Sequence, residues 1–296
     1  MPTAETDIYR GRERHLRLAR EDTFGQAPPN PDWRCVPLAP KGWTVHAERR
    51  WFRPGTPQDV ALPGLMSPRG LFRAAPFPQT TGFMLDAALE RPSPEELHSH
   101  TADCLTPAGS RRYTGLTVET LVLSVNGAGA RVGLRFRGRS VSGNISLARS
   151  DFDYTDLTPT PFSLDDAQLD INGAKAAAVS GFTLRADNDL VSGPNEGRRT
   201  AYLLARPRTL TLALEGLDGG DAVGNALRGG SSVSFTADFQ HPAGHQMSIH
   251  LPRLLPRQSD PTAPPGGTVR RTVRLTAAED PDLGYDIDWG VSLSAG

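Results

Sequence analysis

Several residue types are scarce in this 296-residue chain, and each shortage excludes a class of protein. Lysine occurs only at Lys41 and Lys175, so almost every positive charge is an arginine. The formal net charge is −1, which argues against bulk electrostatic capture of nucleic acid, because that binding needs clustered cations against phosphates. The two cysteines, Cys35 and Cys104, support no disulfide framework and indicate a protein made in the cytosol.

Long apolar runs are also missing. No stretch of about 18 apolar residues is available to span a bilayer, and the polar, acidic residues 3–9 have no apolar signal-peptide core. The sequence therefore predicts neither secretion nor a membrane span. Nucleotide-binding and serine-hydrolase motifs are absent, and no cysteine–histidine dyad is evident, so enzyme chemistry is not favoured.

Glycine and proline, in contrast, are plentiful. The 30 glycines and 26 prolines, with 38% hydrophobic residues, suit many short strands joined by tight turns. The length allows two ordinary domains. Strands are predicted at 43–52, 70–75, 167–172, 178–186, 208–215, 231–240, 246–252, 268–276 and 285–293, with a loop at 53–68.

The clearest hairpin joins strands 114–125 and 131–139 through a turn at 126–130 that contains Asn-Gly. The second strand alternates two kinds of side chain, so one face is predicted to be core. The other face is an arginine comb, which contacts solvent, a neighbouring subunit or an acidic partner. The core positions are Val132, Leu134 and Phe136, and the comb is Arg131, Arg135, Arg137 and Arg139.

Two stretches share one plan, a strand followed by a short helix. The first is strand 70–75 with a helix at 81–89 capped by Thr80; the second is strand 209–214 with a helix at 222–227 capped by Asp221. The predicted fold is therefore mainly β, with two tandem β-sandwich or barrel modules, each flanked by one short α-helix. Residues 1–20 are predicted to be an N-terminal arm or edge strand, 21–150 the first module and 151–296 the second.

Two polar clusters contain residue types that could form a metal-binding or catalytic site. His98, His100 and Asp103 have the residue types of a metal site, which would make the protein a metallohydrolase, but their spacing is weakly specific. The acidic residues between 279 and 288 lack the glycine and terminal glutamate of a calcium-binding EF-hand loop, and two of them fit the polar face of a strand. We therefore predict no catalytic residues, no metal and no cofactor.

Three stretches, taken in their order along the chain, carry a family resemblance. They are Arg-Tyr-Thr-Gly-Leu and the long strand that follows it at 112–125, the strand 182–190 with its Asp-Asn end, and the strand end 247–253. With the two strand–helix units, they resemble the tail tube proteins of long-tailed, siphovirus-like bacteriophages, specifically the large two-module type, over most of residues 20–293. The resemblance implies tail-tube-like β-modules assembled in rings that stack into a hollow tube, without catalytic residues.

A ring whose modules share one continuous barrel has no open sheet edges. Three chains would supply six modules in a pseudo-sixfold ring, and six chains are the alternative. The resemblance also implies a place in the virion tail after synthesis in the host bacterial cytoplasm, with tape-measure and tail-terminator proteins as partners and transient, non-specific passage of double-stranded DNA during ejection. The alternative function is a carbohydrate- or protein-binding β-sandwich of a tail tip or adhesion apparatus.

Three sets of residues are expected to matter in such a tube. Carboxylates on polar strand faces are predicted to line the lumen, since an acidic lining does not hold DNA. The arginine comb is assigned to subunit interfaces. The loop 253–268, with Arg253, Arg257 and Asp260, is predicted to reach the neighbouring ring, so deleting residues 256–266 should leave rings that cannot stack. The lumen candidates are Glu119, Asp170, Asp187, Asp238, Asp286 and Asp288.

Overall fold

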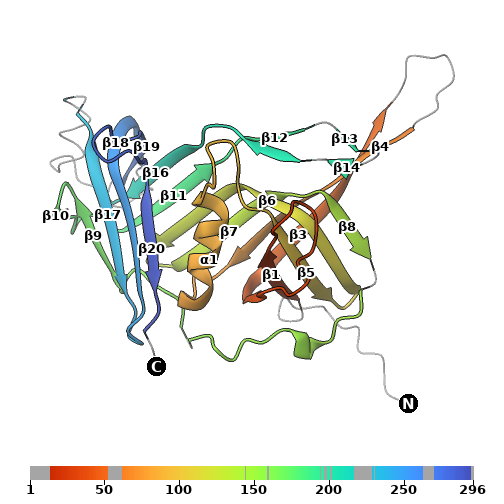
Figure 1. The fold of residues 1–296 in the computed structure, drawn as a ribbon. Coiled ribbons are helices and arrows are strands. Elements are labelled where there is room, and N and C mark those ends of the chain that lie inside the picture. Colours follow the sequence, from red (N-terminus) through yellow and green to blue (C-terminus); the bar gives the residue numbers. More distant parts are fainter. Residues whose placement is uncertain are drawn as a thin grey trace.

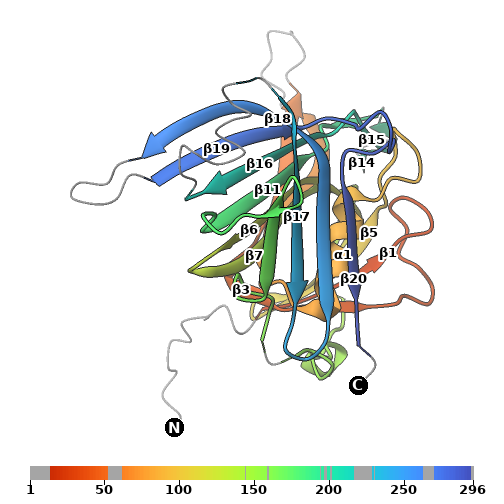
Figure 2. The same cartoon turned by 90° about the vertical axis from the view of Figure 1, so that its left-hand side faces the viewer.

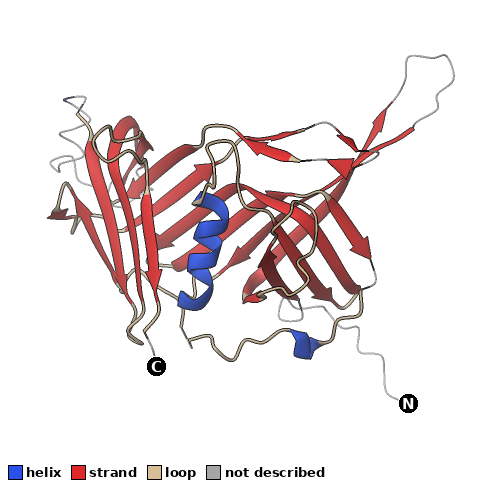
Figure 3. Cartoon of the chain, in the orientation of Figure 1, coloured by secondary structure: helices blue, strands red, loops and turns tan. Residues whose placement is uncertain are grey.

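The computed structural model describes residues 14–52, 62–143, 145–158, 160–193, 195–196, 199–200, 202–216, 229, 231–262 and 270–294. Within these residues the protein is mainly β, as predicted, with one α-helix and a short 3-10 turn at Arg149–Asp151 (Figures 1 and 3). No helix of this part of the chain is both long and apolar enough to cross a membrane.

The strands fall into two consecutive units. The first is β1 (His15–Arg20), β2 (Arg34–Val36), β3 (Leu38–Phe52), β4 (Leu62–Ala74), α1 (Pro78–Leu89), β5 (His100–Thr106), β6 (Gly109–Asn126), β7 (Gly129–Arg137) and β8 (Ser140–Gly143). The second is β9 (Ala167–Ile171), β10 (Ala174–Lys175), β11 (Gly181–Asp187), β16 (Thr209–Glu215), β17 (Val233–Gln240), β18 (Gln246–Thr262), β19 (Arg270–Ala277) and β20 (Asp288–Ser292). Four short strands pair separately between β11 and β16: β12 (Leu190–Ser192) with β15 (Leu203–Ala205), and β13 (Asn195–Glu196) with β14 (Arg199–Thr200).

The two units have the same strand pairing. In the first, the order of hydrogen-bonded neighbours is β2-β1-β5-β6-β7-β4-β3, and β8 also pairs with β6. In the second, the order is β10-β9-β17-β18-β19-β16-β11, and β20 also pairs with β18. The structure therefore repeats one antiparallel scheme twice.

The irregularities of the ladders repeat as well. In β6 the register shifts between Val118 and Thr120, opposite β7, and in β18 it shifts between Pro256 and Gln258, opposite β19. A second shift, where β5 meets Leu116 of β6, recurs where β17 meets Leu254 of β18. Because β-bulges are specific features of a fold, their recurrence makes β6 and β18 equivalent strands.

The units join through β6 and β11, which makes one sheet of sixteen strands. Figure 2 shows β7, β6, β11, β16 and β19 as one curved layer, with β17, β18 and β20 in front of it. One hydrophobic cluster includes residues of both units, from Leu16 to Ile287. The module boundary at residue 150 stays a prediction, since strand pairing and the core continue across it.

Helix α1 covers the first unit and meets the second. It contacts β6, β7, β2 and β20. Helical spacing predicts one apolar face of Phe83, Met84, Ala87 and Ala88, of which the last three are buried and Phe83 is half-buried. The predicted capping by Thr80 is wrong, because the helix begins earlier: Phe77 is the N-cap and Pro78 holds the first turn. The predicted helix at 222–227 and its cap at Asp221 lie outside the described residues.

The predicted β-hairpin is confirmed with a shorter turn. β6 and β7 pair up to Asn126↔Gly129, which leaves a two-residue connection, and the positive φ of 119° falls on Gly129. Val132, Leu134 and Phe136 are buried. Two predicted loops are partly wrong, because residues 62–68 belong to β4 and residues 253–262 belong to β18.

Candidate assembly surface

The β6–β11 join connects the two units by seven residue pairs, from Gly181↔Asn126 to Asp187↔Thr120. Side chains reinforce the backbone ladder. The Thr183 hydroxyl donates to the Ser124 hydroxyl at 3.1 Å, and Thr120 Oγ1 donates to Asp187 Oδ1 at 2.9 Å. Such cross-strand pairs stabilise a sheet, so the units are held by a continuous ladder.

Asn188, directly after β11, anchors this join and is fully buried. Its Nδ2 donates to the carbonyls of Ala88, in α1, and Val118, in β6, at 2.9 and 3.0 Å. Its backbone N–H donates to the Glu119 carbonyl at 2.9 Å, and its Oδ1 accepts from Arg91 at 3.1 Å. One amide side chain therefore ties a strand of the second unit to a helix and a strand of the first. The sequence pattern predicts no anchoring role for Asn188 and marks only the Asp-Asn end of the strand 182–190.

Arg208 makes a second tie, beside the first. Its Nη1 donates to the Leu89 carbonyl at the end of α1 at 2.7 Å, and its guanidinium forms a two-point ion pair with Asp286. Bidentate pairs of this kind are directional as well as strong. Asp286, predicted to line a lumen, is therefore engaged within the chain.

One face of the sheet formed by β4, β7, β6, β11, β16 and β19 points away from the core, and we call it the polar face. Side chains alternate along each strand, so this face holds the residues between the buried ones. Its carboxylates include Asp187 and Glu215, both half-buried. Five of its arginines are exposed: Arg73, Arg131, Arg135, Arg185 and Arg274.

Two of these arginines occupy equivalent positions. Arg135 of β7 pairs with Thr120, and Arg274 of β19 pairs with Gln258, the residues just after the two equivalent bulges. Four residues earlier, each strand again has an arginine, Arg131 in β7 and Arg270 in β19. The spacing of this arginine pair is thus the same in both units, although the surrounding sequences differ.

The predicted lumen residues divide into separate groups. Asp187 lies on the polar face and accepts two bonds from Arg185, at 2.6 and 2.7 Å, while Glu119, at the bulge of β6, forms an ion pair with Arg137. Asp170, Asp238 and Asp288 lie on another layer of the same sheet, formed by β9, β17, β18 and β20. Its outward face carries two neighbouring rows: Asp170, Thr236, His250 and Asp288, then Gln168, Asp238, Ser248 and Gly290.

The arginine comb also divides. Arg131 and Arg135 are exposed, as an interface role requires. Arg137 is bound within the chain by Glu119 and the Leu190 carbonyl, and Arg139 Nη1 donates to the Phe24 carbonyl at 3.1 Å. The subunit-interface role stays a prediction for all four, and the geometry leaves the first two side chains most accessible.

The predicted inter-ring residues lie along β18. Arg253 Nη1 is 3.5 Å from the Glu279 carbonyl, and Arg257, at the bulge, is exposed. The side chain of Asp260 lies outside the described residues, but its backbone pairs with Thr272 of β19. These residues therefore belong to a long hairpin and not to a loop.

Among the strand edges that lack a neighbour in the described residues, two are equivalent to the edges joined by β6 and β11. β3 pairs only with β4, and the outer part of β18, from Gln258 to Thr262, pairs only with β19. The strand equivalent to β3 is β11 of the second unit, and the strand equivalent to β18 is β6 of the first. These two equivalents pair with each other. One copy thus contains one complete join, between β6 and β11. It also contains the two unpaired edges, of β3 and of the outer part of β18, that could form a second join with another copy.

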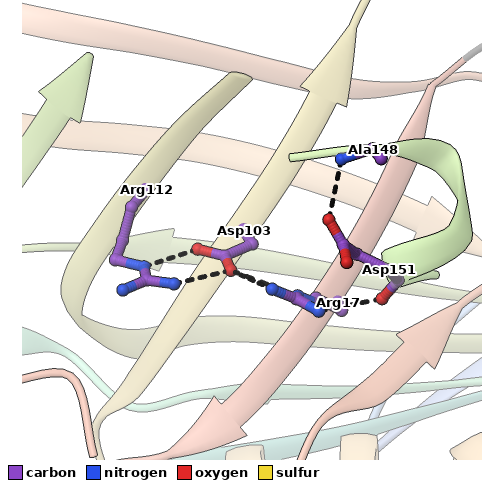
Figure 4. A network of polar contacts seen from close by, with 5 residues as sticks. All are labelled: Arg17, Asp103, Arg112, Ala148 and Asp151. Atoms are coloured by element: carbon purple, nitrogen blue, oxygen red, sulfur yellow. Dashed lines mark hydrogen bonds and ion pairs between the residues drawn. The ribbon is translucent and has the colours of Figure 1, made fainter. Parts of the chain in front are cut away.

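Asp103, a candidate metal ligand, has other partners (Figure 4). Its carboxylate is fully buried and accepts bonds from Arg17 Nη2 at 2.9 Å and Arg112 Nε at 2.6 Å. Arg17 also donates to the Asp151 carbonyl at 2.8 Å, and the Asp151 carboxylate accepts from the Ala148 N–H at 2.7 Å. Hydrogen bonding to Asp103 raises the pKa of Arg112. The network fastens the segment between the units to β1, β5 and β6.

The two histidines of the same candidate site do not converge with Asp103. His100 is buried with its ring edge-on to Phe83, and burial lowers its pKa to about 4. His98 Nε2 lies 2.6 Å from Arg20 Nη2. No group of three potential metal ligands occurs within the described residues. The thiols Cys35 and Cys104 are free, and burial raises the pKa of Cys104 to about 12, which suppresses the reactive thiolate.

The tryptophans with described side chains also have partners within the chain. Arg17 lies over the Trp33 ring, 4.3 Å from its centroid, and Trp289 Nε1 donates to Asp86 at 2.9 Å. The binding-module alternative expected exposed aromatics, whereas both of these rings are half-buried.

Comparison with known proteins agrees with the assembly features. A family model described as "Phage tail tube protein" matches residues 11–286, which is most of the chain. No curated protein matches the sequence. The matched region contains the first unit, the second unit up to β19, the β6–β11 join and the unpaired edges of β3 and β18, and because the match covers most of the chain, the chain belongs to the phage tail tube protein family.

Proposed function

We propose that three copies of this structural component of a phage tail form a closed ring, that rings stack into a hollow tube, and that double-stranded DNA passes through the tube during ejection. The observation that carries this proposal is the repeated pairing scheme, with one join made within the chain and its counterpart left open.

The two open edges lie at opposite ends of one run of strands, β3-β4-β7-β6-β11-β16-β19-β18. They therefore do not meet within one copy, whereas β3 of one copy can meet β18 of the next. Exposed edges invite pairing. A head-to-tail contact closes into a ring if the rotation between neighbouring copies is a whole fraction of a full turn. With two units per chain, three copies supply the six units of a pseudo-sixfold ring.

The polar face is proposed to line the bore. Its opposite side is covered by the hydrophobic core and α1, so a barrel closed from these strands turns the polar face inward. Glu119 and Asp187 then contribute carboxylates to the bore, while Asp170, Asp238 and Asp288 face elsewhere. Arg131 and Arg135 share the polar face, so they are proposed to line the bore in place of the subunit interface that the sequence predicts for them. Because Arg137 and Arg185 are paired with these acids, a mixed lining would hold DNA phosphates less strongly than an unpaired basic one.

The β18–β19 hairpin is proposed to contact the neighbouring ring through its outer end. Figure 2 shows both strands extending beyond the ends of β16 and β11. Asp260 lies level with the end of β16, since Thr272 pairs with both Asp260 and Glu215, so it marks the base of this extension, and Arg257 and Arg253 lie further back along β18. Tape-measure and tail-terminator proteins are the further partners proposed for the assembled tube, which would be built from chains made in the host cytoplasm.

Negative-stain electron microscopy with native mass measurement of concentrated protein tests the proposal. We expect hollow rings with three times the 31.9-kDa mass of the chain, and striated tubes where rings stack. Rings of six chains would reject the three-copy arrangement while keeping the tube. Discrete monomers under all conditions would reject assembly itself and favour the binding module.

A further inference from the structure

We propose that β3 of one copy pairs antiparallel with the outer part of β18 in the next copy, in the register of the β6–β11 join. This inference rests on the proposed ring and adds the residues that close it. The pairs are Thr44↔Thr262, Val45↔Pro261, His46↔Asp260, Ala47↔Ser259 and Glu48↔Gln258.

The equivalence of β3 and β11 follows from the strand beside each. Phe72 of β4 lies between Trp43 of β3 and Leu134 of β7. Leu214 of β16 lies in the same way between Phe182 of β11 and Val273 of β19. Trp43 therefore corresponds to Phe182. With the same offset of 139 residues, residues 44–48 of β3 correspond to residues 183–187 of β11.

The equivalence of β6 and β18 follows from their bulges. Aligning the shift at Val118/Thr120 with that at Pro256/Gln258 makes Thr120 equivalent to Gln258 and Ser124 equivalent to Thr262. The same offset of 138 residues makes Leu116 equivalent to Leu254, where each strand meets the second bulge. Transferring Thr183↔Ser124 from the internal join then gives Thr44↔Thr262 between copies.

The residue types support the transferred register. The hydroxyl pair of Thr183 and Ser124 becomes a pair of threonines, and the Thr183 counterpart, Thr44, is exposed. The acid of β11, Asp187, is matched by Glu48. The apolar residues Trp43, Val45 and Ala47 correspond in the sequence to Phe182, Leu184 and Ala186, which are buried.

The prolines of β18 fit an edge that is open until assembly. Pro261 lies in its outer part and Pro256 just before it, and proline is tolerated in a sheet mainly on edge strands, because it has no N–H to donate. Proline also hinders indiscriminate edge-to-edge aggregation. The contact between copies would therefore have fewer hydrogen bonds than the β6–β11 join. Such a weaker contact would form only between copies whose edges are correctly aligned.

Cysteine cross-linking tests the register. In the double variant Thr44→Cys/Thr262→Cys, oxidation of assembled protein should give covalent species of up to three chains on a non-reducing gel. Mixing the two single variants should give only covalent dimers, which establishes that the bond joins different copies. The double variant Thr183→Cys/Ser124→Cys should cross-link within one chain and serves as the matched positive control.

The register control is Thr44→Cys/Asp260→Cys, which shifts one partner by two residues on the same face. We expect at least tenfold less cross-linked product from it and from each single variant alone. Equal cross-linking by the shifted pair, or none by the proposed pair while microscopy shows rings, would overturn the register and leave the ring standing. Absence of rings in the unmodified protein would instead overturn the proposed function.

Discussion

At the scale of single residues, the stability of the fold depends most clearly on the buried carboxylate of Asp103. Two arginines converge on it, and removing one partner of a buried ion pair leaves charge uncompensated. We expect Asp103→Asn to lower the free energy of unfolding by about 3 kcal/mol or more, measured by urea denaturation of the purified chain.

The matched control for this substitution is Asp32→Asn. Asp32 pairs with Arg34 at 2.7 Å, but both side chains are more than half exposed, and such pairs contribute little to stability. A change within about 0.5 kcal/mol is expected for the control. If Asp103→Asn behaved like the control, the network of Figure 4 would not hold the segment between the units in place.

His100 gives the protein a predictable pH dependence. Its pKa in the folded chain is about 4, below the ordinary value of 6.5, so the unfolded chain binds the proton first as the pH falls. Stability from this group is therefore complete above about pH 6.5 and is lost as the pH falls towards 4.

Between pH 7 and pH 5, the loss from this group should be about 2 kcal/mol in the free energy of unfolding. The variant His100→Gln does not titrate, so its stability should fall less than that of the unmodified protein over the same range. Urea denaturation at both pH values measures the difference. Parallel losses in the two proteins would contradict the assignment.

At the scale of secondary-structure elements, Asn188 tests whether the β6–β11 join is a single cooperative unit. Asn188→Ala leaves the carbonyls of Ala88 and Val118 without their donor in a buried setting, which costs roughly 1–3 kcal/mol for each unsatisfied group. We expect a loss of at least about 2 kcal/mol in unfolding free energy and, because the join sets how the units meet, fewer complete rings in micrographs.

Asn30→Ala is the control, because Asn30 is exposed and outside the strands. It should change neither stability nor ring formation. A similarly small effect of Asn188→Ala on both measurements would show that the backbone ladder alone holds the units together.

The β18–β19 hairpin shows how element prediction failed. Residues 253–268 contain four prolines and two glycines, a composition typical of loops. The structure nevertheless pairs β18 with β19 as far as Thr262↔Arg270, because a strand with one unpaired side tolerates proline there. The proposed deletion of residues 256–266 would therefore remove paired strand as well as the end of the hairpin.

At the scale of the whole molecule, a sharper variant separates stacking from ring closure. Replacing residues 263–269 with Asn-Gly joins the paired ends of β18 and β19 through a two-residue turn. We expect rings of normal size but at least tenfold fewer tubes in negative-stain micrographs.

The control for this variant is Pro107→Asn/Ala108→Gly. It places the same dipeptide in the existing two-residue connection between Thr106 and Gly109, and tube formation should be unchanged. Unimpaired tubes from the hairpin variant would reject the inter-ring role of the hairpin end, whereas loss of the rings themselves would assign the hairpin end to ring closure.

Sequence alone determined the features that depend on local pattern. Alternation in β7, β11, β16 and β17 revealed strands and their buried faces, helical spacing revealed α1, and the order of the stretches revealed the family. Periodicity and turn chemistry are local, so these features need no knowledge of distant partners.

Only the tertiary structure decided which residues meet. Local pattern gave His98, His100 and Asp103 the appearance of a metal site, and the fold gave Asp103 two arginines instead. It also placed Glu119 and Asp187 beside the arginines of the polar face and Asp170, Asp238 and Asp288 on another layer of the sheet. Contacts between residues a hundred positions apart, such as Asn188 and Ala88, are set by sheet register. The unpaired edges of β3 and β18 were likewise invisible until the register was known, because an edge is defined by the neighbour it lacks.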